Sequence, residues 1–205
     1  MAPDQPFRTL LAISALIALP TLLYHRIQSQ RTREKLDRRQ EGLFILATLR
    51  PIGLVLLLSV FAYLTDPSSM AWSSVPLPRW LRWLGIELCV AGTILLVWTL
   101  RSLGRNLTDT VVTRREHSLV THGPYRWVRH PFYGAVTLLL LGNSLAAGNW
   151  FILLLGAVVL SLIYIRTRTE EQKLLERFGS DYRGYMDRTG RFFPRIGPKR
   201  TKAER

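Results

Sequence analysis

The stretch FYGAVTLLLLGNSLAAGNWFILLLGAVVLSLIYI, Phe132 to Ile165, contains no charged side chain and is interrupted only by Gly148-Asn149. Its two apolar arms predict a tight helical hairpin. Each arm has about 16 residues, roughly 24 Å of helix at 1.5 Å per residue. A bilayer span ordinarily needs about 20 residues, so the hairpin spans with local thinning or with partial shielding by other helices.

Three further apolar segments precede this hairpin, at about Leu10–Tyr24, Leu43–Leu64 and Trp80–Leu100. Their length and lack of charge indicate membrane helices rather than a water-soluble core. The first is short enough for a cleaved signal peptide, but its dense charge follows the apolar run, which favours an uncleaved span. The sequence therefore predicts an all-α membrane protein with about five transmembrane helices, the second interrupted at Arg50-Pro51 and the third containing Glu87.

The basic residues alternate between the two sides of this layout. Six Lys or Arg lie between the first two spans, six between Arg101 and Arg129, and twelve from Arg166 to Arg205. The remaining linker has only Arg79, and the hairpin turn has none. The positive-inside rule then predicts a multi-pass protein with its N-terminus outside and its C-terminus in the cytoplasm.

Composition also bears on partners. The net charge of +14 raises nucleic acid as a partner, but the basic residues cluster beside the apolar runs and no nucleic-acid-binding motif is present. Membrane lipids are therefore the expected partner. Nucleic acid is not expected as a partner. A single cysteine, Cys89, cannot form a cysteine metal cluster, so no metal is expected either. The chain also lacks the motifs of soluble dinucleotide-binding, phosphate-binding and nucleophile-elbow enzymes.

A polar stretch, HSLVTHGPYRWVRHPFY at 117–133, lies directly before the hairpin. Polar residues beside spans are costly unless they line a cavity, pair or bind a ligand. Gly123-Pro124 predicts a turn that lets His117, Tyr125 and His130 converge. Arg129 and His130 precede Pro131, where the helix N-terminus favours a carboxylate. The alternative is that Pro131 merely opens a helix and Arg129 reaches lipid headgroups.

A second polar set, Arg166 to Glu171, follows the hairpin, and we expect it to complete the same site. Arg166 and Glu170 share a helix face, which is also the pattern of an ordinary ion pair. Glu170 and Glu171 are suited to bind a cation or accept a proton. An amphipathic helix then follows, which Gly179 breaks or bends, and it lies on the cytosolic side. Residues 196–205 have the composition of a disordered basic tail.

Five motifs occur in one order along the chain. They are His117-x-Leu119-Val120-Thr121-x-Gly123-x-Tyr125, Arg129-His130-Pro131-x-Tyr133, Arg166-x-x-x-Glu170-Glu171, Phe178-Gly179-x-x-Tyr182-x-x-Tyr185 and Thr189-Gly190-Arg191-x-x-Pro194. In this combination they resemble the isoprenylcysteine carboxyl methyltransferase family and its phospholipid methyltransferase relatives, over about residues 101–195. The resemblance implies a cofactor-binding methyltransferase core at 101–195, which follows the three predicted N-terminal spans and their basic cytosolic loop at 1–100.

The resemblance also implies S-adenosylmethionine as cofactor and a lipidic or prenylated small-molecule substrate that arrives from the bilayer. The residues it implies on the cofactor side are His117, Leu119, Gly123, Tyr125, Arg129, His130, Tyr133, Glu171 and Arg191. Arg166 and Glu170 are the implied catalytic residues, in a site that faces the cytoplasm. Arg129 suits the cofactor carboxylate, Glu170 or Glu171 its ammonium, and Tyr125 or Tyr133 its sulfonium.

Alternatives remain at this stage. A carboxylate acceptor needs no general base, whereas a phospholipid amine must lose a proton that Glu170 can take. A membrane reductase of the sterol reductase type, which uses NADPH, shares the Arg-His-Pro-x-Tyr region. A non-catalytic membrane scaffold with an interfacial ion network is the third possibility.

Overall fold

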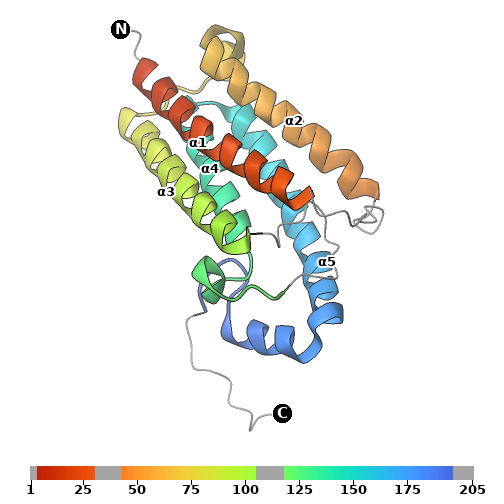
Figure 1. Cartoon of the computed structure of the whole chain (residues 1–205). Helices are drawn as coiled ribbons and strands as arrows, with labels where there is room; N and C mark the ends of the chain where they lie inside the picture. The colour runs from red at the N-terminus through yellow and green to blue at the C-terminus, as the bar shows by residue number, and fades with distance from the viewer. Residues whose placement is uncertain (1–3, 31–42, 105–117, 196–205) are drawn as a thin grey trace.

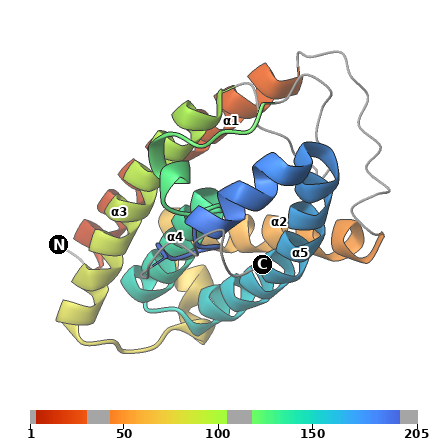
Figure 2. The same ribbon diagram turned by 90° about the horizontal axis from the view of Figure 1, so that it is seen from below.

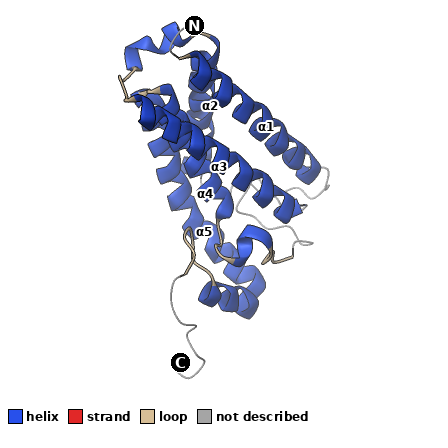
Figure 3. Cartoon of the chain, turned by 90° about the vertical axis from the view of Figure 1, so that its left-hand side faces the viewer, coloured by secondary structure: helices blue, strands red, loops and turns tan. Residues whose placement is uncertain are grey.

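The computed structural model describes residues 4–30, 43–104 and 118–195. These residues form α-helices and short 3-10 helices, with no strand apart from two isolated bridges (Figure 3). The elements in chain order are α1 (Gln5–Gln30), α2 (Leu43–Thr65), η2 (Pro67–Ser73), α3 (Arg79–Leu103), η4 (Gly123–Arg126), α4 (Pro131–Ala147) and α5 (Trp150–Arg188). His117, most of the basic loop after α1 and the tail at 196–205 lie outside the described residues.

The five long helices lie side by side as one bundle (Figure 1). Four of them, α1, α2, α3 and α5, are long and apolar enough to cross a membrane, and α4 is a shorter apolar helix. Their outer surfaces are apolar as well, since Leu16, Phe61 and Ile94 are each more than 60% exposed. Large apolar side chains on the outside of a bundle are expected where the surrounding solvent is lipid.

The predicted hairpin is confirmed, and its turn is built from the two residues that interrupt the apolar run. Gly148 ends α4 in the left-handed conformation (φ 58°), and its N–H donates to the Leu145 carbonyl. Asn149 caps α5 by accepting a hydrogen bond from the Ile152 N–H at 3.0 Å. Asn149 also donates to the Ser73 hydroxyl at 2.7 Å, which joins the turn to η2.

Two expectations about helix boundaries are wrong. Pro51 does not interrupt α2, because a proline removes only one backbone hydrogen bond and the helix continues on both sides. The fifth helix does not end at Ile165 but continues to Arg188, so the amphipathic segment is its extension. The predicted bend is confirmed at Gly179, whose φ of 52° turns the last part of α5 across the lower end of the bundle (Figures 1 and 2).

The contact between α3 and α4 depends on two facing glycines. A Cβ atom on Gly142 would lie 2.7 Å from the Gly85 carbonyl oxygen and 2.8 Å from the Cys89 nitrogen. Both helices therefore approach backbone to backbone, as small residues allow in membrane helix pairs. Cys89 is almost fully buried in this contact, where it packs as a small apolar side chain.

The end of the bundle where α1 and α3 begin is closed by arginine side chains. Arg82 of α3 donates to the Ala146 carbonyl at 2.9 Å and the Tyr63 hydroxyl at 3.1 Å, and it pairs with Asp4. Arg8 of α1 donates to the Leu64 carbonyl at 2.6 Å. These contacts join four helices at this end. Arg50 and Glu87 have exposed side chains on α2 and α3 and take no part in this packing.

We expect Gly142→Ala to lower the thermal stability of the detergent-purified protein. The added methyl group meets backbone atoms that have no rotamer to relieve the clash, and overpacking of this kind typically costs about 1–3 kcal/mol. Gly53→Ala is the matched control, because a Cβ atom there meets nothing within 4 Å. Equal melting temperatures for the two variants would contradict the backbone-to-backbone contact.

Candidate functional site

The motif loop, residues 118–130, leads into the start of α4 and packs against the end of α3. Its turn is η4, which begins at Gly123 with φ 59°, and a Cβ atom there would collide with the Ser102 side chain of α3. The loop ends where Pro131 opens α4, as predicted, with His130 as the N-cap residue. The sequence therefore fixes the loop at both ends, against α3 and on α4.

The C-terminal strap, residues 189–195, pairs with the motif loop through its backbone. The Arg129 N–H donates to the Gly190 carbonyl at 2.9 Å, and the His130 N–H donates to the Arg191 carbonyl at 3.0 Å. The Tyr185 hydroxyl of α5 donates to the Tyr125 carbonyl at 2.6 Å. Residues about 60 apart in sequence are thus joined around one loop.

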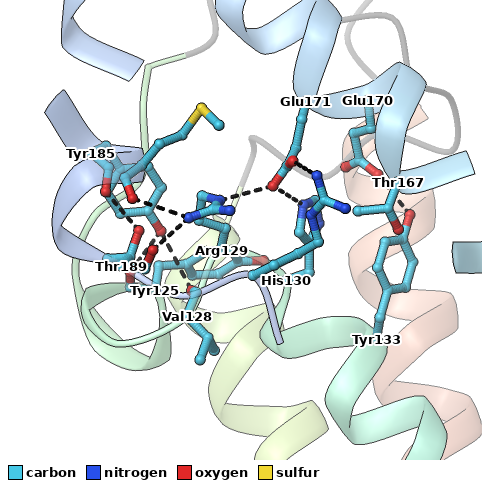
Figure 4. Close-up of polar contacts among 12 residues, drawn as sticks. Tyr125, Val128, Arg129, His130, Tyr133, Thr167, Glu170, Glu171, Tyr185 and Thr189 are labelled. Carbon is cyan, nitrogen blue, oxygen red and sulfur yellow. Dashed lines mark hydrogen bonds and ion pairs between the residues drawn. The ribbon is translucent and has the colours of Figure 1, made fainter. Parts of the chain in front are cut away.

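The carboxylate of Glu171 is the centre of the polar cluster at this end of the bundle (Figure 4). Its Oε1 accepts from Arg129 Nε at 2.8 Å and lies 3.4 Å from His130 Nε2. Its Oε2 pairs with the Arg191 guanidinium. The Glu171 and Arg129 side chains are only 6% and 10% exposed, so this pair lies away from water. We call Arg129, His130, Glu171 and Arg191 the Glu171 cluster.

The charge of Glu171 is stabilised by these partners. Burial raises the pKa of the carboxyl group, but hydrogen bonds from His130, Arg191 and Arg129 outweigh burial and hold the pKa well below its ordinary value of 4.5. Glu171 is therefore ionised throughout the physiological range. The hydrogen bond from Glu171 in turn raises the pKa of Arg191.

Glu170, the neighbouring carboxylate, has a different environment. Its Oε2 accepts a hydrogen bond from the Tyr133 hydroxyl of α4 at 2.8 Å. The Tyr133 ring stacks on the His130 ring, with ring centroids 5.5 Å apart. The Phe192 ring of the strap also contacts the His130 ring, with centroids 5.8 Å apart. Glu170 is half-buried, whereas Glu171 is buried and bound by two guanidinium groups.

The structure brings most of the predicted site residues together. The ones that meet at this end of the bundle are Tyr125, Arg129, His130, Tyr133, Glu170, Glu171 and Arg191. Arg166 lies one turn before Glu170, and its charge acts on the Tyr133 hydroxyl. Leu119 and Gly123 lie in the motif loop, where Gly123 allows the close approach to α3. The prediction for His117 lies outside the described residues.

Sequence reasoning gave no role to two tyrosines of α5. Tyr182 and Tyr185 were expected as part of an amphipathic helix, and both are in fact buried beside the cluster. Tyr185 binds the motif loop, whereas the Tyr182 hydroxyl has no hydrogen-bond partner among the described residues. Their spacing of three was visible in the sequence, but only the bend at Gly179 directs that face toward the motif loop.

The site combines the Glu171 cluster with a second carboxylate, Glu170, which accepts a hydrogen bond from Tyr133. The Glu171 cluster contains two guanidinium groups and one carboxylate, so its guanidinium groups exceed the carboxylate by one positive charge. A further anion can neutralise this excess. Glu170 and Tyr133 provide a negative and aromatic wall that suits a cation. Within the described ranges, no group of three or more His, Cys, Asp or Glu side chains is arranged to hold a metal ion. The arrangement suits a ligand that carries both signs of charge.

Comparison with known proteins gives one family. Residues 83–176 match the model of the isoprenylcysteine carboxyl methyltransferase (ICMT) family. The chain is 32% identical over 128 residues to a protein-S-isoprenylcysteine O-methyltransferase of Tribolium castaneum, covering 58% of this chain and 43% of that protein. It is 29% identical over 139 residues to protein-S-isoprenylcysteine O-methyltransferase B of Arabidopsis thaliana, covering 66% and 70%.

A solved structure is similar as well. It is that of the eukaryotic intramembrane Ras methyltransferase ICMT, with a TM-score of 0.51, 25% sequence identity, and coverage of 72% of this chain and 52% of that one. The chain thus spans about half the length of the solved protein and less than half of the beetle protein. The apolar helices and this similarity together identify the chain as an integral membrane protein.

We expect Glu171→Gln to destabilise the protein at pH 7, because it leaves Arg129 without its buried counterion, a loss of about 3 kcal/mol or more. Glu171 has a lowered pKa, so its stabilisation is complete above the unfolded value of 4.5 and is lost as the pH falls toward the folded value. The difference in melting temperature between wild type and variant is therefore equal at pH 7 and pH 5 and smaller at pH 3. Glu176→Gln, on the exposed face of α5, is the matched control. A difference that does not shrink at pH 3 would contradict the role of the charge.

Proposed function

We propose that the chain is a member of the isoprenylcysteine carboxyl methyltransferase family, an S-adenosylmethionine-dependent membrane methyltransferase that esterifies the carboxylate of an isoprenylcysteine-like amphiphile. The observation that supports it best is that two neighbouring carboxylates with different partners lie at one end of a bundle of membrane-length helices. Glu171 is bound by Arg129, His130 and Arg191, and Glu170 is bound by Tyr133.

The donor set fits the charges of S-adenosylmethionine, which carries a carboxylate, an ammonium and a sulfonium. The Glu171 cluster, with its additional positive charge, suits the carboxylate end. Glu170 and the Tyr133 ring suit the cationic groups. When bound, the sulfonium supplies an activated methyl group whose carbon–sulfur bond breaks as the acceptor oxygen bonds to the methyl carbon.

The residues of this chain contribute alignment and exclusion of water rather than proton transfer. A carboxylate acceptor has no proton to lose, so catalysis depends on orientation in a dry site. We assign the orientation of the acceptor carboxylate to Arg166, one helical turn before Glu170. Glu171 acts through Arg129 and His130, which it holds in place, and not by contact with the acceptor.

The amphiphilic substrate fits the position of the site. The Glu171 cluster lies at the end of the apolar helices where α5 leaves the bundle (Figure 1). We infer that this end faces the cytoplasm, because the three basic regions of the chain adjoin it. A prenyl chain in the bilayer then places its polar head at the depth of Glu170.

We expect the detergent-purified protein to transfer labelled methyl groups from S-adenosylmethionine to a farnesylcysteine analogue. The product is an ester and loses its label in mild base, whereas a methylated amine does not. Phosphatidylethanolamine in the same assay tests the amine alternative. Binding of NADPH, but not of S-adenosylhomocysteine, would overturn the proposal in favour of a reductase.

Glu170→Gln tests the charge at the cationic wall. The amide oxygen still accepts the Tyr133 hydrogen bond, so the fold is retained, but the negative charge is lost. We expect kcat/KM for methyl transfer to fall by about 100-fold, the scale of removing one electrostatic contact in an active site. The exposed Glu176→Gln is again the control. Full activity in Glu170→Gln would remove Glu170 from the site.

The orientation is testable with fusions in cells. We expect a fluorescent reporter that requires the cytoplasm to be active at the C-terminus. A reporter that requires the outside should be active after Pro76, in the linker between η2 and α3. The opposite pattern at both positions would place the site on the other face of the membrane.

A further inference from the structure

Tyr182 of α5 carries a buried hydroxyl group that has no hydrogen-bond partner within the described part of the chain. The side chain is among the most completely buried, with 1% exposure. Its neighbour Tyr185, whose ring centroid is 5.9 Å away, uses its hydroxyl to bind the Tyr125 carbonyl at 2.6 Å. Buried hydroxyl groups are normally satisfied, so the Tyr182 hydroxyl points to a partner that the chain does not itself provide.

The neighbours of Tyr182 identify the site to which its hydroxyl belongs. The Tyr182 ring lies against Tyr185, whose hydroxyl binds the motif loop that also carries Arg129. The charges of Glu171, Arg129 and Glu170 reach the Tyr182 hydroxyl, which therefore lies near the Glu171 cluster. Burial and then the nearby Glu171 raise the pKa of Tyr182, which keeps the phenol protonated and able to donate. A protonated phenol that has no partner needs an acceptor, and the nearby Arg129 favours one that is an anion.

We propose that the Tyr182 hydroxyl donates a hydrogen bond to the carboxylate at the amino-acid end of the bound methyl donor. The inference deepens the proposed function and rests on it. The Glu171 cluster contains two guanidinium groups and one carboxylate, so a ligand carboxylate completes its charge. The same carboxylate satisfies the hydroxyl that the protein leaves without a partner. The ammonium and the sulfonium then extend toward Glu170 and Tyr133.

The experiment combines one substitution with two ligands. Tyr182→Phe removes the hydroxyl and keeps the ring that fills the core. Calorimetry measures binding of S-adenosylhomocysteine and of its decarboxylated analogue, which keeps the ammonium. We expect Tyr182→Phe to weaken binding of S-adenosylhomocysteine about tenfold or more, as for a hydrogen bond to a charged group, and to leave binding of the analogue unchanged.

Thermal unfolding without ligand supplies the structural control. Tyr182→Phe removes no hydrogen bond within the protein, so its melting temperature should equal or exceed that of wild type. Tyr185→Phe removes the bond to the Tyr125 carbonyl and should melt at a lower temperature. A loss of stability in Tyr182→Phe equal to that in Tyr185→Phe would show that the hydroxyl has a partner within the protein and would overturn the inference.

The outcomes separate the two proposals. If wild type binds S-adenosylhomocysteine and Tyr182→Phe binds it equally well, the inference fails and the proposed function stands. Equal weakening for both ligands means that the hydroxyl contacts a group other than the carboxylate, which also overturns the inference. If wild type binds neither ligand, the proposed function fails first.

Discussion

The buried carboxylate of Glu171 is the constraint on which this end of the molecule depends. An ionised group in so little water is tolerated only when cations neutralise it, and here the cations come from two segments other than its own. Glu171 belongs to α5, Arg129 to the motif loop and Arg191 to the strap. Neutralising one charge therefore brings together three parts of the chain that are distant in sequence.

The apolar bundle supplies the frame for these contacts. Gly85 and Gly142 allow α3 and α4 to meet closely, and α4 in turn carries His130 and Tyr133 at its first turn. At the opposite end, Arg82 joins α1, α2, α3 and α4, which limits their relative movement. Ion pairs and hydrogen bonds thus stabilise both ends of one bundle.

Much of this arrangement could be predicted from the sequence because its signals are local. The hairpin turn follows from Gly148-Asn149, the start of α4 from Pro131, and the bend from Gly179. The continuation of α5 beyond Ile165 is not predicted from the sequence, because the change from apolar to charged residues there resembles a helix end. At the membrane surface the favoured side chains change from apolar to charged, but the helical backbone hydrogen bonds are the same on both sides. One helix can therefore continue from the membrane into water.

The pairing inside the site was beyond sequence reasoning for a different reason. Arg129 was expected to bind a ligand carboxylate directly, yet in the structure it already binds Glu171. Glu170 and Glu171 are adjacent and chemically identical, and only their directions on α5 give one a cluster of cations and the other a tyrosine. A helix turns by 100° per residue, so neighbours on it face different surroundings. The difference in direction therefore places Arg129 and Arg191 around Glu171, while Glu170 meets the Tyr133 hydroxyl.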